Sequence, residues 1–591
     1  MSSVAQPERP RRRKRLWLLA ALVVLVAVGG YFTWTVRTVR SDLLSAEFDA
    51  TQLRTAVLGH DQSAAKIALT SMTTNLDSAQ GHTKSPLWRV AEVLPYVGDD
   101  LHAVRVVSTV GAGLAHGALA DLVAEVDTNI AEQLSPKHGR MNVSAIEGLR
   151  PLVSRVHNSL TAEADKLADI DADKLSGWVR PSYDKFADQV NSVDQAFDAA
   201  NRAVAVLPGM LGKDSPRTYL LAFNNNAEIR ATGGLPGALA ILKADHGKLS
   251  LGTQSNAAEI GQFPQPVLPQ STAEREIYDT QVAEFMGDTN FTPEFPRTAD
   301  LMRAMWAKKY HQHLDGVISV DSVSLAYLLA ATGPLTMPGG VTLTSANAAS
   351  QLLNAVYLRL PTDAQQNDFF EAVASGVFAK LTGGVRSPTA LMQNISRSVD
   401  EGRIHVHSFE PSEQKEIDGT QLAGELSFKN SATPEVGLYL NDATGSKMSY
   451  YLRSTANLTS ASCVSGVQQL AGSATFTSLA PADAKDLPVF ITGGGIYGTP
   501  PGQQLVFGRV YGPVGGKLTN FQFDGKHSVV PSVDDRGRPV ATFAVLLKPG
   551  RTVKMTWQTR TGPGQTKGAR LTMTPGMATG AATRTVGSAC G

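Results

Sequence analysis

Apolar side chains recur every three or four residues over residues 41–207, which is the spacing that places them on one face of a helix. Short breaks at 81–86, 95–98 and 135–136, near Pro151 and at Pro181 separate the periodic runs. The clearest runs are Ala65, Leu69, Met72, Leu76; Leu114, Ala118, Leu122, Val126, Ile130, Leu134; Leu149, Val153, Val156, Leu160, Leu167; and Phe186, Val190, Val193, Phe197, Val204. The pattern predicts an antiparallel helical bundle over 41–207, in which Pro151 either breaks a helix or opens one at about Leu152.

After Pro208-Gly209 and Pro216 the pattern alternates between short apolar runs and longer amphipathic ones. The predicted strands are 218–223, 237–242, 248–252 and 317–320, and the predicted helices are 298–309, 322–331, 345–358 and 364–381. Such alternation favours a mixed α/β domain with a central sheet over residues 216–430.

From about residue 436 the chain changes to short strand-type runs between Gly and Pro turns. The predicted strands are 436–440, 450–455, 504–511, 518–523, 539–547 and 551–559, with a turn at 548–550 and loops at 561–565 and 576–588. We expect a β-sandwich-like domain over residues 436–591. The whole chain is therefore expected to be an α+β multidomain protein.

Residues 16–36 form an uncharged stretch of 21 residues, the length of a helix that spans a bilayer. Trp17 lies near one end, and Tyr31, Phe32 and Trp34 lie near the other, as interfacial aromatic belts do. The basic tail of residues 1–15 favours a cytoplasmic N-terminus. A cleaved signal peptide is the alternative, but its short apolar core and small-residue cleavage site are absent. We expect a single-pass cell-membrane anchor with an extracytoplasmic C-terminal bulk.

The overall charge says little about function, because 54 basic and 53 acidic side chains leave a formal net charge of +1. Six basic side chains against one acidic one give residues 1–15 a charge of +5, and nothing in the balance indicates a nucleic-acid partner. A hydrophobic content of 42% excludes a disordered chain. Cys463 and Cys590 are the only cysteines, and export favours a disulfide between them over two unrelated buried thiols.

The segment 223–237 is the most unusual polar loop, because amides, a carboxylate, a guanidinium and a hydroxyl lie between two predicted strands. Arg230 suits bidentate binding of phosphate or carboxylate. The candidate ligand-binding residues here are Asn225, Glu228, Arg230 and Thr232. The alternative is a structural Asn/Gly turn in which Arg230 pairs with Glu228.

A second candidate segment is 357–368, where Arg359 can add positive charge to an anion pocket and Thr362 or Asp363 can cap the next helix. Asp315 and Asp321 flank the strand 316–320, and either can hold a hard cation or serve in a turn or a cap. His311-x-His313 and His405-x-His407 lack an obvious third metal ligand nearby in sequence.

Several segments together resemble the bacterial membrane-anchored family named domain of unknown function 4012. They are PLWR (86–89), LPYVG (94–98), NNAEIRATGG (225–234), NFTPEFP (290–296), DGVISVD (315–321), AATGPLT (330–336) and YLNDATGSK (439–447). The likeness runs in order over about residues 80–455. It implies a bacterial, actinobacterial envelope protein and supplies no function.

The order of Arg230, Asp321, Arg359 and Gln365-Gln366 also resembles that of LytR–CpsA–Psr proteins. Those enzymes are single-pass and transfer glycopolymers from polyprenyl-pyrophosphate carriers to peptidoglycan, with arginines on the pyrophosphate and an acidic residue with magnesium. The resemblance implies Arg230, Arg359 and Gln366 as ligand contacts, and Asp321 and Arg230 as catalytic residues with magnesium on Asp321. The family's Arg-Ser-Asp-Thr pattern is replaced here by Arg230-Ala231-Thr232-Gly233.

Two functions follow from these features. The first is a non-catalytic envelope protein that binds a wall polymer or a partner protein and needs no cofactor. The second is a LytR–CpsA–Psr-like transferase that acts on a polyprenyl-pyrophosphate-linked glycopolymer and uses magnesium.

Overall fold

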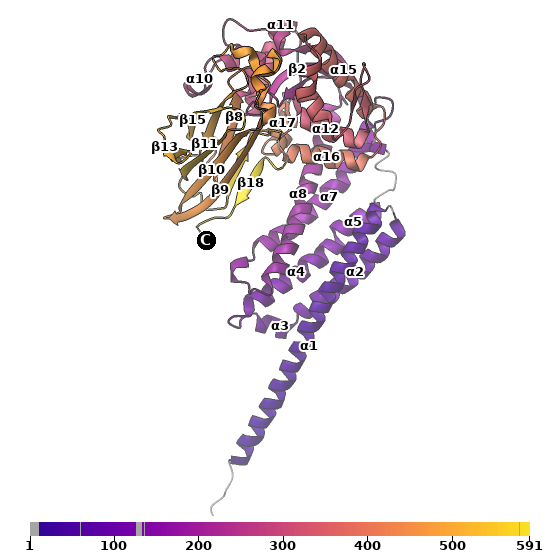
Figure 1. The fold of residues 1–591 in the computed structure, drawn as a ribbon. Coiled ribbons are helices and arrows are strands. Elements are labelled where there is room, and N and C mark those ends of the chain that lie inside the picture. The colour runs from indigo at the N-terminus through magenta and orange to yellow at the C-terminus, as the bar shows by residue number, and fades with distance from the viewer. Residues whose placement is uncertain (1–10, 60, 126–132, 135, 578–579, 591) are drawn as a thin grey trace, which may run out of the picture. The chain divides into compact units, whose positions relative to one another are not determined.

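The computed structural model describes residues 11–59, 61–125, 133–134, 136–577 and 580–590, and of residues 11–25, 58 and 125 only the backbone. The chain divides into two compact units. Unit 1 is Met1–Gln133 with Ser144–Ala205, and unit 2 is Leu134–Val143 with Val206–Gly591 (Figure 1).

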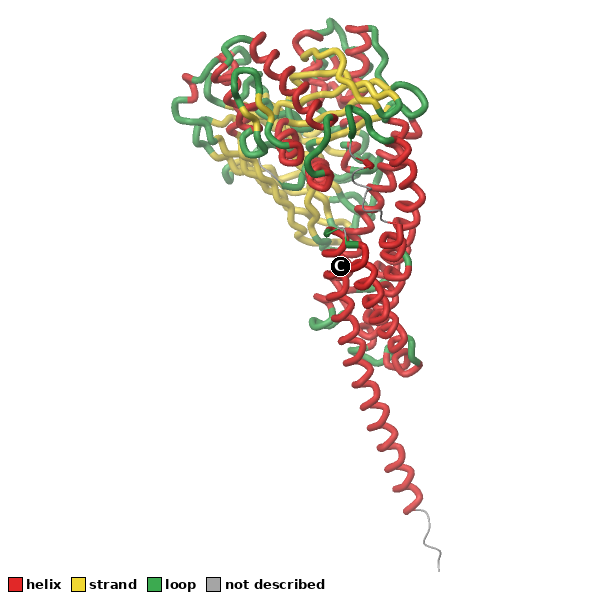
Figure 2. The backbone as a smooth tube through the Cα atoms, turned by 90° about the vertical axis from the view of Figure 1, so that its right-hand side faces the viewer, coloured by secondary structure: helices red, strands yellow, loops and turns green. Residues whose placement is uncertain are grey.

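Unit 1 is helical, as predicted (Figure 2), and its apolar helix faces pack in several cores, of which one is the largest. Leu114, Val156, Leu160 and Val190 are part of this core, which explains the spacing of the apolar residues. The helices are α1 (Arg11–Leu58), α2 (Gln62–Thr83), α3 (Pro86–Ala91), α4 (Gly98–His116), α5 (Ala118–Glu125), α7 (Val143–Ala168) and α8 (Arg180–Met210), the last of which ends in unit 2.

Two predictions about the bundle are wrong. Pro151 neither breaks nor opens a helix, because α7 begins at Val143 and continues through it. Only one amide hydrogen is lost at a proline, and the buried face with Leu152 and Val156 compensates for it. Residues Leu134–Val143 belong to unit 2, where the Met141 N–H donates to the carbonyl of Gly247 at 2.8 Å. Val126 and Ile130 of the predicted apolar run lie outside the described residues.

One helical stretch among the residues whose side chains are described is long and apolar enough to cross a membrane. It is Gly98–Ala124, with a mean hydropathy of 1.4, and 44% of its most apolar window is buried inside the protein. Ala103, Val110 and Leu114 from this stretch contribute to the bundle core. Its apolar character therefore also has a packing role. The predicted span 16–36 lies within α1, and the side chains of its residues 16–25 are outside the described part.

The first half of unit 2 contains the predicted α/β layer. Its sheet has the order β3-β2-β1-β4-β7, in which only β1 and β4 run parallel. The strands are β1 (Arg217–Asn225), β2 (Leu235–Asp245), β3 (Lys248–Asn256), β4 (Gly316–Asp321) and β7 (Ile404–Ser408). The longer helices are α11 (Phe295–Tyr310), α12 (Ser322–Thr332), α15 (Asp363–Thr382) and α16 (Pro388–Asp400).

Helices cover both faces of this sheet. Leu220 and Ile241 share a core with Met302 and Trp306 of α11. On the opposite face, Gln254 donates to Ser375 of α15 at 3.1 Å. The helix predicted over 345–358 is present in three pieces, α13 (Ala348–Ser350), a π turn (Gln351–Ala355) and α14 (Val356–Arg359).

The second half of unit 2 consists mainly of strands, and it belongs to the same compact unit as the α/β layer. Two sheets, β14-β15-β11-β8-β17-β18 and β13-β12-β16-β10-β9, share one core that includes Leu438, Phe476, Val510 and Trp557. The strands are β8 (Glu435–Asp442), β9 (Leu452–Val464), β10 (Val467–Ser478), β11 (Gln504–Tyr511), β12 (Lys517–Phe523), β13 (Lys526–His527), β14 (Ser532–Asp535), β15 (Arg538–Leu547), β16 (Thr552–Arg560), β17 (Ala569–Met573) and β18 (Thr583–Val586).

The loop expected over 576–588 contains a strand, which corrects the prediction. β18 pairs with β17 at the edge of the six-stranded sheet, where Leu571 lies opposite Arg584. An edge strand needs only one partner and shows little apolar alternation, so its sequence resembles a loop. The turn at 548–550 is present, and it carries the chain from one sheet to the other.

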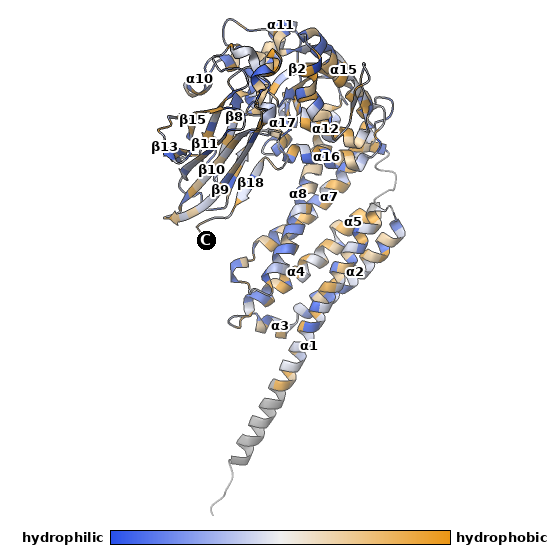
Figure 3. Ribbon diagram, in the orientation of Figure 1, coloured by the Kyte–Doolittle hydropathy of each residue, from blue (hydrophilic) through white to orange (hydrophobic). Residues whose placement is uncertain are grey.

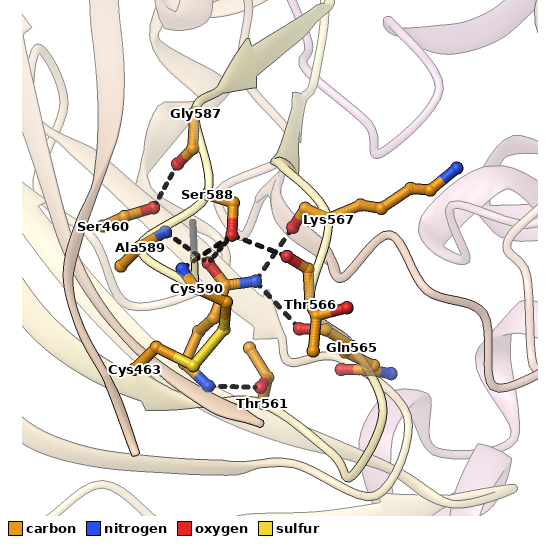
Figure 4. The surroundings of a disulfide bond; sticks show 11 residues. Ser460, Cys463, Thr561, Gln565, Thr566, Lys567, Gly587, Ser588, Ala589 and Cys590 are labelled. Carbon is orange, nitrogen blue, oxygen red and sulfur yellow. Dashed lines mark hydrogen bonds between the residues drawn. A yellow bond between two sulfur atoms is a disulfide. The ribbon is translucent and has the colours of Figure 1, made fainter. Parts of the chain in front are cut away.

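The expected disulfide between Cys463 and Cys590 is present, with 5.0 Å between the two Cα atoms (Figure 4). Hydrogen bonds hold the C-terminal segment beside it. Ser588 Oγ donates to the carbonyl of Thr566 at 2.6 Å, and Ser460 Oγ donates to that of Gly587 at 2.5 Å. The bridge thus ties the end of the chain to β9.

Candidate functional site

The parallel pairing of β1 and β4 brings the polar loop and Asp321 together. Asn224 lies opposite Asp321 in the register, so the carboxyl ends of both strands meet at one sheet edge. Asn226 Nδ2 donates to Asp321 Oδ2 at 2.8 Å. We call residues 224–234 the Asn–Arg loop. It is tightly folded, since a Cβ on Gly234 would overlap the backbone of Asn225.

Arg230 is buried inside unit 2, with a side chain 5% exposed. Its guanidinium donates to Glu228 Oε1 at 2.8 Å and to Asp288 Oδ1 at 3.2 Å, and it lies 4.7 Å from the centre of the Phe291 ring. The structural alternative, a turn in which Arg230 pairs with Glu228, is the arrangement observed. Arg230 Nε has no hydrogen-bond partner among the described residues.

Glu228 lies between two cations, because Lys447 donates to its second oxygen. Burial alone would raise the pKa of Glu228, but the charges of Lys447 and Arg230 outweigh burial and lower it. Burial raises the pKa of Asp288 and that of Asp442, and the negative charge of Glu228 adds to both shifts. The cluster therefore favours one ionised carboxylate held by two cations, a stabilising role for the Asn–Arg loop.

Asp321 caps α12, as predicted. Its Oδ1 accepts the N–H of Ser324 at 2.7 Å, within a capping box. Its Oδ2 accepts from Arg403 Nη1 at 2.7 Å, and Arg403 Nε donates to Glu401 Oε2 at 2.5 Å. The Arg403 and Asp321 side chains are 1% and 0% exposed. Burial alone would lower the pKa of Arg403, and the charges of Asp321 and Glu401 raise it instead.

The other predicted ligand-binding residues form hydrogen bonds with protein groups of unit 2. Asn225 Nδ2 donates to the hydroxyl of Tyr357 at 2.5 Å, and Thr232 Oγ1 accepts from Asn290 at 3.1 Å. Gln366 is buried, and its amide donates to the carbonyl of Leu360 at 2.9 Å. Arg359 is exposed at the end of α14, and its Nε donates to the carbonyl of Ala355 at 3.3 Å. Arg230 and Asp321 lie in neighbouring buried clusters, whereas Arg359 is exposed to solvent.

No group of three or more His, Cys, Asp or Glu side chains arranged to hold a metal ion occurs among the described residues. Both Asp321 oxygens accept from protein donors, and the Arg403 guanidinium supplies the neighbouring positive charge. Magnesium on Asp321 stays an untested prediction. His405 is buried and stacks on Phe295 with 5.2 Å between the ring centres. Asp315 accepts from the N–H of Thr218 at 2.7 Å.

An open hollow lies beside the buried Arg403, in the same unit. Its cavity volume is about 70 Å³, and it opens to solvent. Hydroxyl groups and one exposed arginine line it, namely Ser449, Ser454, Thr455, Thr574 and Arg584, together with apolar residues such as Ile229 and Met573. The buried Ser449 Oγ has no hydrogen-bond partner within the described residues. The hollow can therefore offer hydrogen-bond donors and a positive charge to a ligand.

Sequence reasoning missed five charged residues of these clusters, namely Asp288, Glu401, Arg403, Asp442 and Lys447. Asp442 and Lys447 occur in one of the segments that carry the family resemblance. That resemblance was the one sign in the sequence that could have pointed to them. Asp288 and Arg403 reach the loop through folding alone, since 58 and 173 residues separate them from Arg230.

Comparisons with known proteins give one family and no activity. No curated protein matches the chain significantly. The solved structure of the transcriptional regulator yvhJ from Bacillus subtilis is similar at 10% identity, over 36% of this chain and 83% of that chain, with a TM-score of 0.21. A TM-score this low assigns no fold. Residues 214–357 match the model of the family described as protein of unknown function (DUF4012), which confirms over that region the family expected from the sequence.

Proposed function

We propose that this chain is a membrane-tethered bacterial envelope protein whose second unit lies outside the cell and binds a segment of wall polymer without catalysing its transfer. The observation that carries this proposal is the burial of Arg230 and Asp321 in ion pairs. A pyrophosphate would have to displace Glu228 and Asp288 from Arg230, which leaves the buried Asp288 without its cation and Glu228 with Lys447 alone.

The tether is supported by sequence and by the described part of α1. Residues 16–36 are uncharged, and α1 is one continuous helix from Arg11 to Leu58. Val26, Val28, Tyr31 and Trp34 are exposed, with fractions of 67%, 39%, 46% and 53%. Exposed apolar and aromatic side chains on a helix suit a lipid environment.

The hollow beside Arg403 is the binding place that we propose. A wall polymer presents hydroxyl and anionic groups, and the hollow presents Ser449, Thr455 and the exposed Arg584. Within the described residues no ion pair of Arg584 is found, whereas Arg403 is already paired with two carboxylates. Arg584 is thus the cation available to an anionic ligand.

Binding of purified wall-polymer fragments to the full chain in nanodiscs tests this proposal. We expect Arg584→Ala to weaken binding about tenfold, the loss of one charge-assisted contact. Arg551→Ala removes the same charge from an exposed residue paired with Asp524 and serves as the matched control. Equal affinities of the two variants, or no binding by the wild type, would contradict the proposal.

The transferase alternative makes a different prediction. It requires the wild-type chain to bind a polyprenyl-pyrophosphate lipid in the presence of magnesium, at Arg230. We expect no such binding, because the guanidinium is closed off by Glu228, Asp288 and Phe291. Magnesium-dependent binding of that lipid would favour the transferase instead.

A further inference from the structure

An apolar surface lies on the short segment between α2 and α4. Within residues 86–97, six apolar side chains are exposed instead of packed. They are Leu87 (38%), Val90 (65%), Val93 (80%), Leu94 (51%), Tyr96 (100%) and Val97 (42%). Six neighbouring exposed apolar residues are more than a folded surface carries by chance, so they mark a contact with another apolar medium.

The segment is held in place by its own contacts. Trp88 is 1% exposed, and its indole N–H donates to the carbonyl of Leu101 at 3.0 Å. Arg105 Nε donates to Glu92 Oε1 at 2.5 Å. A Cβ on Gly98 would overlap the carbonyl of Glu92, so the turn that follows α3 is tightly closed. The exposed side chains are therefore displayed on a fixed scaffold.

This segment packs at the place where α1 leaves the bundle. The rings of Trp88 and Phe32 are 5.7 Å apart, and Phe32 also packs against the core formed by Val39 and Trp88. Residues 26–31 of α1, on the side toward the predicted span, are all exposed. Figure 3 shows α3 beside α1 at the end of the bundle from which α1 projects. The apolar segment thus lies level with the aromatic end of the span.

An exposed tryptophan lies at the same end of the bundle. Trp178 is 69% exposed in the turn between α7 and α8. The N–H of Ser176 in this turn donates to Asp100 Oδ1 at 2.9 Å, at the start of α4. Tryptophan side chains prefer the headgroup layer of a bilayer, because the ring is apolar whereas its N–H still forms a hydrogen bond there.

The charges around the segment suit a lipid headgroup layer. Arg37, Arg40, Lys84 and Arg89 are exposed, against the exposed Asp99. Of the acids between α7 and α8, Asp171 pairs with Lys174 at 3.2 Å and Asp173 with Arg180 at 2.9 Å, whereas Asp169 is exposed. Basic side chains that flank an apolar surface are typical of helices that lie in the membrane interface.

We propose that residues 86–97, with Trp178, form a membrane foot that inserts into the headgroup layer of the bilayer crossed by α1. This inference rests on the tether proposed above, because the tether brings the foot to the bilayer. The foot gives unit 1 a second attachment to the membrane, and it fixes the tilt of the bundle on the surface where a lone helix would leave it free.

Fluorescence of a polarity-sensitive probe on the full chain tests the foot. The chain is reconstituted into vesicles of phosphatidylethanolamine and phosphatidylglycerol, with the probe on a single introduced cysteine, since Cys463 and Cys590 are bonded to each other. Leu94→Cys reports on the foot, Val26→Cys on the tether, and Ser63→Cys on the start of α2, at the other end of the bundle. We expect probes at 94 and 26 to emit at shorter wavelength and to be quenched by nitroxide lipids, and the probe at 63 to behave as in water.

The outcomes separate the two proposals. A probe at 94 that behaves like the one at 63, while the probe at 26 is quenched, overturns the foot and leaves the tether. A probe at 26 that behaves as in water overturns the tether itself. Val93→Asp with Tyr96→Asp should keep the wild-type Tm, because both side chains are exposed, and should abolish the shift at 94. An unchanged shift at 94 in this folded variant would also contradict the foot.

Discussion

At the residue scale, the candidate site is governed by buried charges that satisfy one another. Asp321 accepts from Ser324, Asn226 and Arg403, and Glu228 accepts from Arg230 and Lys447. Buried charges persist only when paired, and such pairs fix the geometry of the loop that contains them. The sequence showed both carboxylates and could not show their partners, which come from distant segments.

The pair between Arg403 and Asp321 can be tested by removing one charge. Arg403→Ala leaves Asp321 buried without its cation and leaves Arg397 as the remaining cation of Glu401. We expect the free energy of unfolding to fall by about 3–5 kcal/mol. Chemical denaturation measures it, with Arg551→Ala as the exposed control, for which less than about 1 kcal/mol is expected. Equal losses in the two variants would contradict the structural role of Arg403.

His405 gives unit 2 a pH-dependent stability. Burial lowers the pKa of His405 to about 4, whereas an unfolded histidine titrates near 6.5. The unfolded chain therefore binds the proton first, and stability present above about pH 6.5 is lost as the pH falls toward 4, up to about 3 kcal/mol. Unfolding measured from pH 7 to 4.5 should show a smaller loss for His405→Gln than for the wild type. Identical pH slopes would show that His405 has no such role.

At the element scale, most strands and helices could be predicted, because burial on one face leaves a period in the sequence. Asp321 was predicted to cap α12 and does so. Each of the wrong predictions has a physical reason. Tertiary packing carries α7 through Pro151, and the edge strand β18 shows little alternation. β10 was not predicted either, since polar residues fill its exposed face.

The disulfide is the element-scale feature whose removal is simplest to measure. It closes a loop of 127 residues between Cys463 and Cys590, which restricts the unfolded chain. We expect Cys463→Ser with Cys590→Ser to lower the free energy of unfolding by about 2–5 kcal/mol. The wild type under a reducing agent should fall to the value of the variant. Unchanged stability in both would mean that the bridge contributes nothing.

At the scale of the whole molecule, the proposed tether precedes a helical unit and a unit that combines the α/β layer with the two β-sheets. The sequence indicated the class of each part from its hydrophobic period. It could not indicate that Leu134–Val143 leaves the helical unit for the other one, because that choice depends on backbone contacts such as the one between Met141 and Gly247.

In our proposal residues 16–36 are a retained tether, and everything after them lies outside the cell. Labelling of intact cells with a membrane-impermeant maleimide tests it most directly. We predict that Ser63→Cys in the full-length, membrane-bound chain is labelled in intact cells and that Ser3→Cys is labelled only after the cells are opened. The opposite pattern, or a shortened chain released into the medium, would contradict the account.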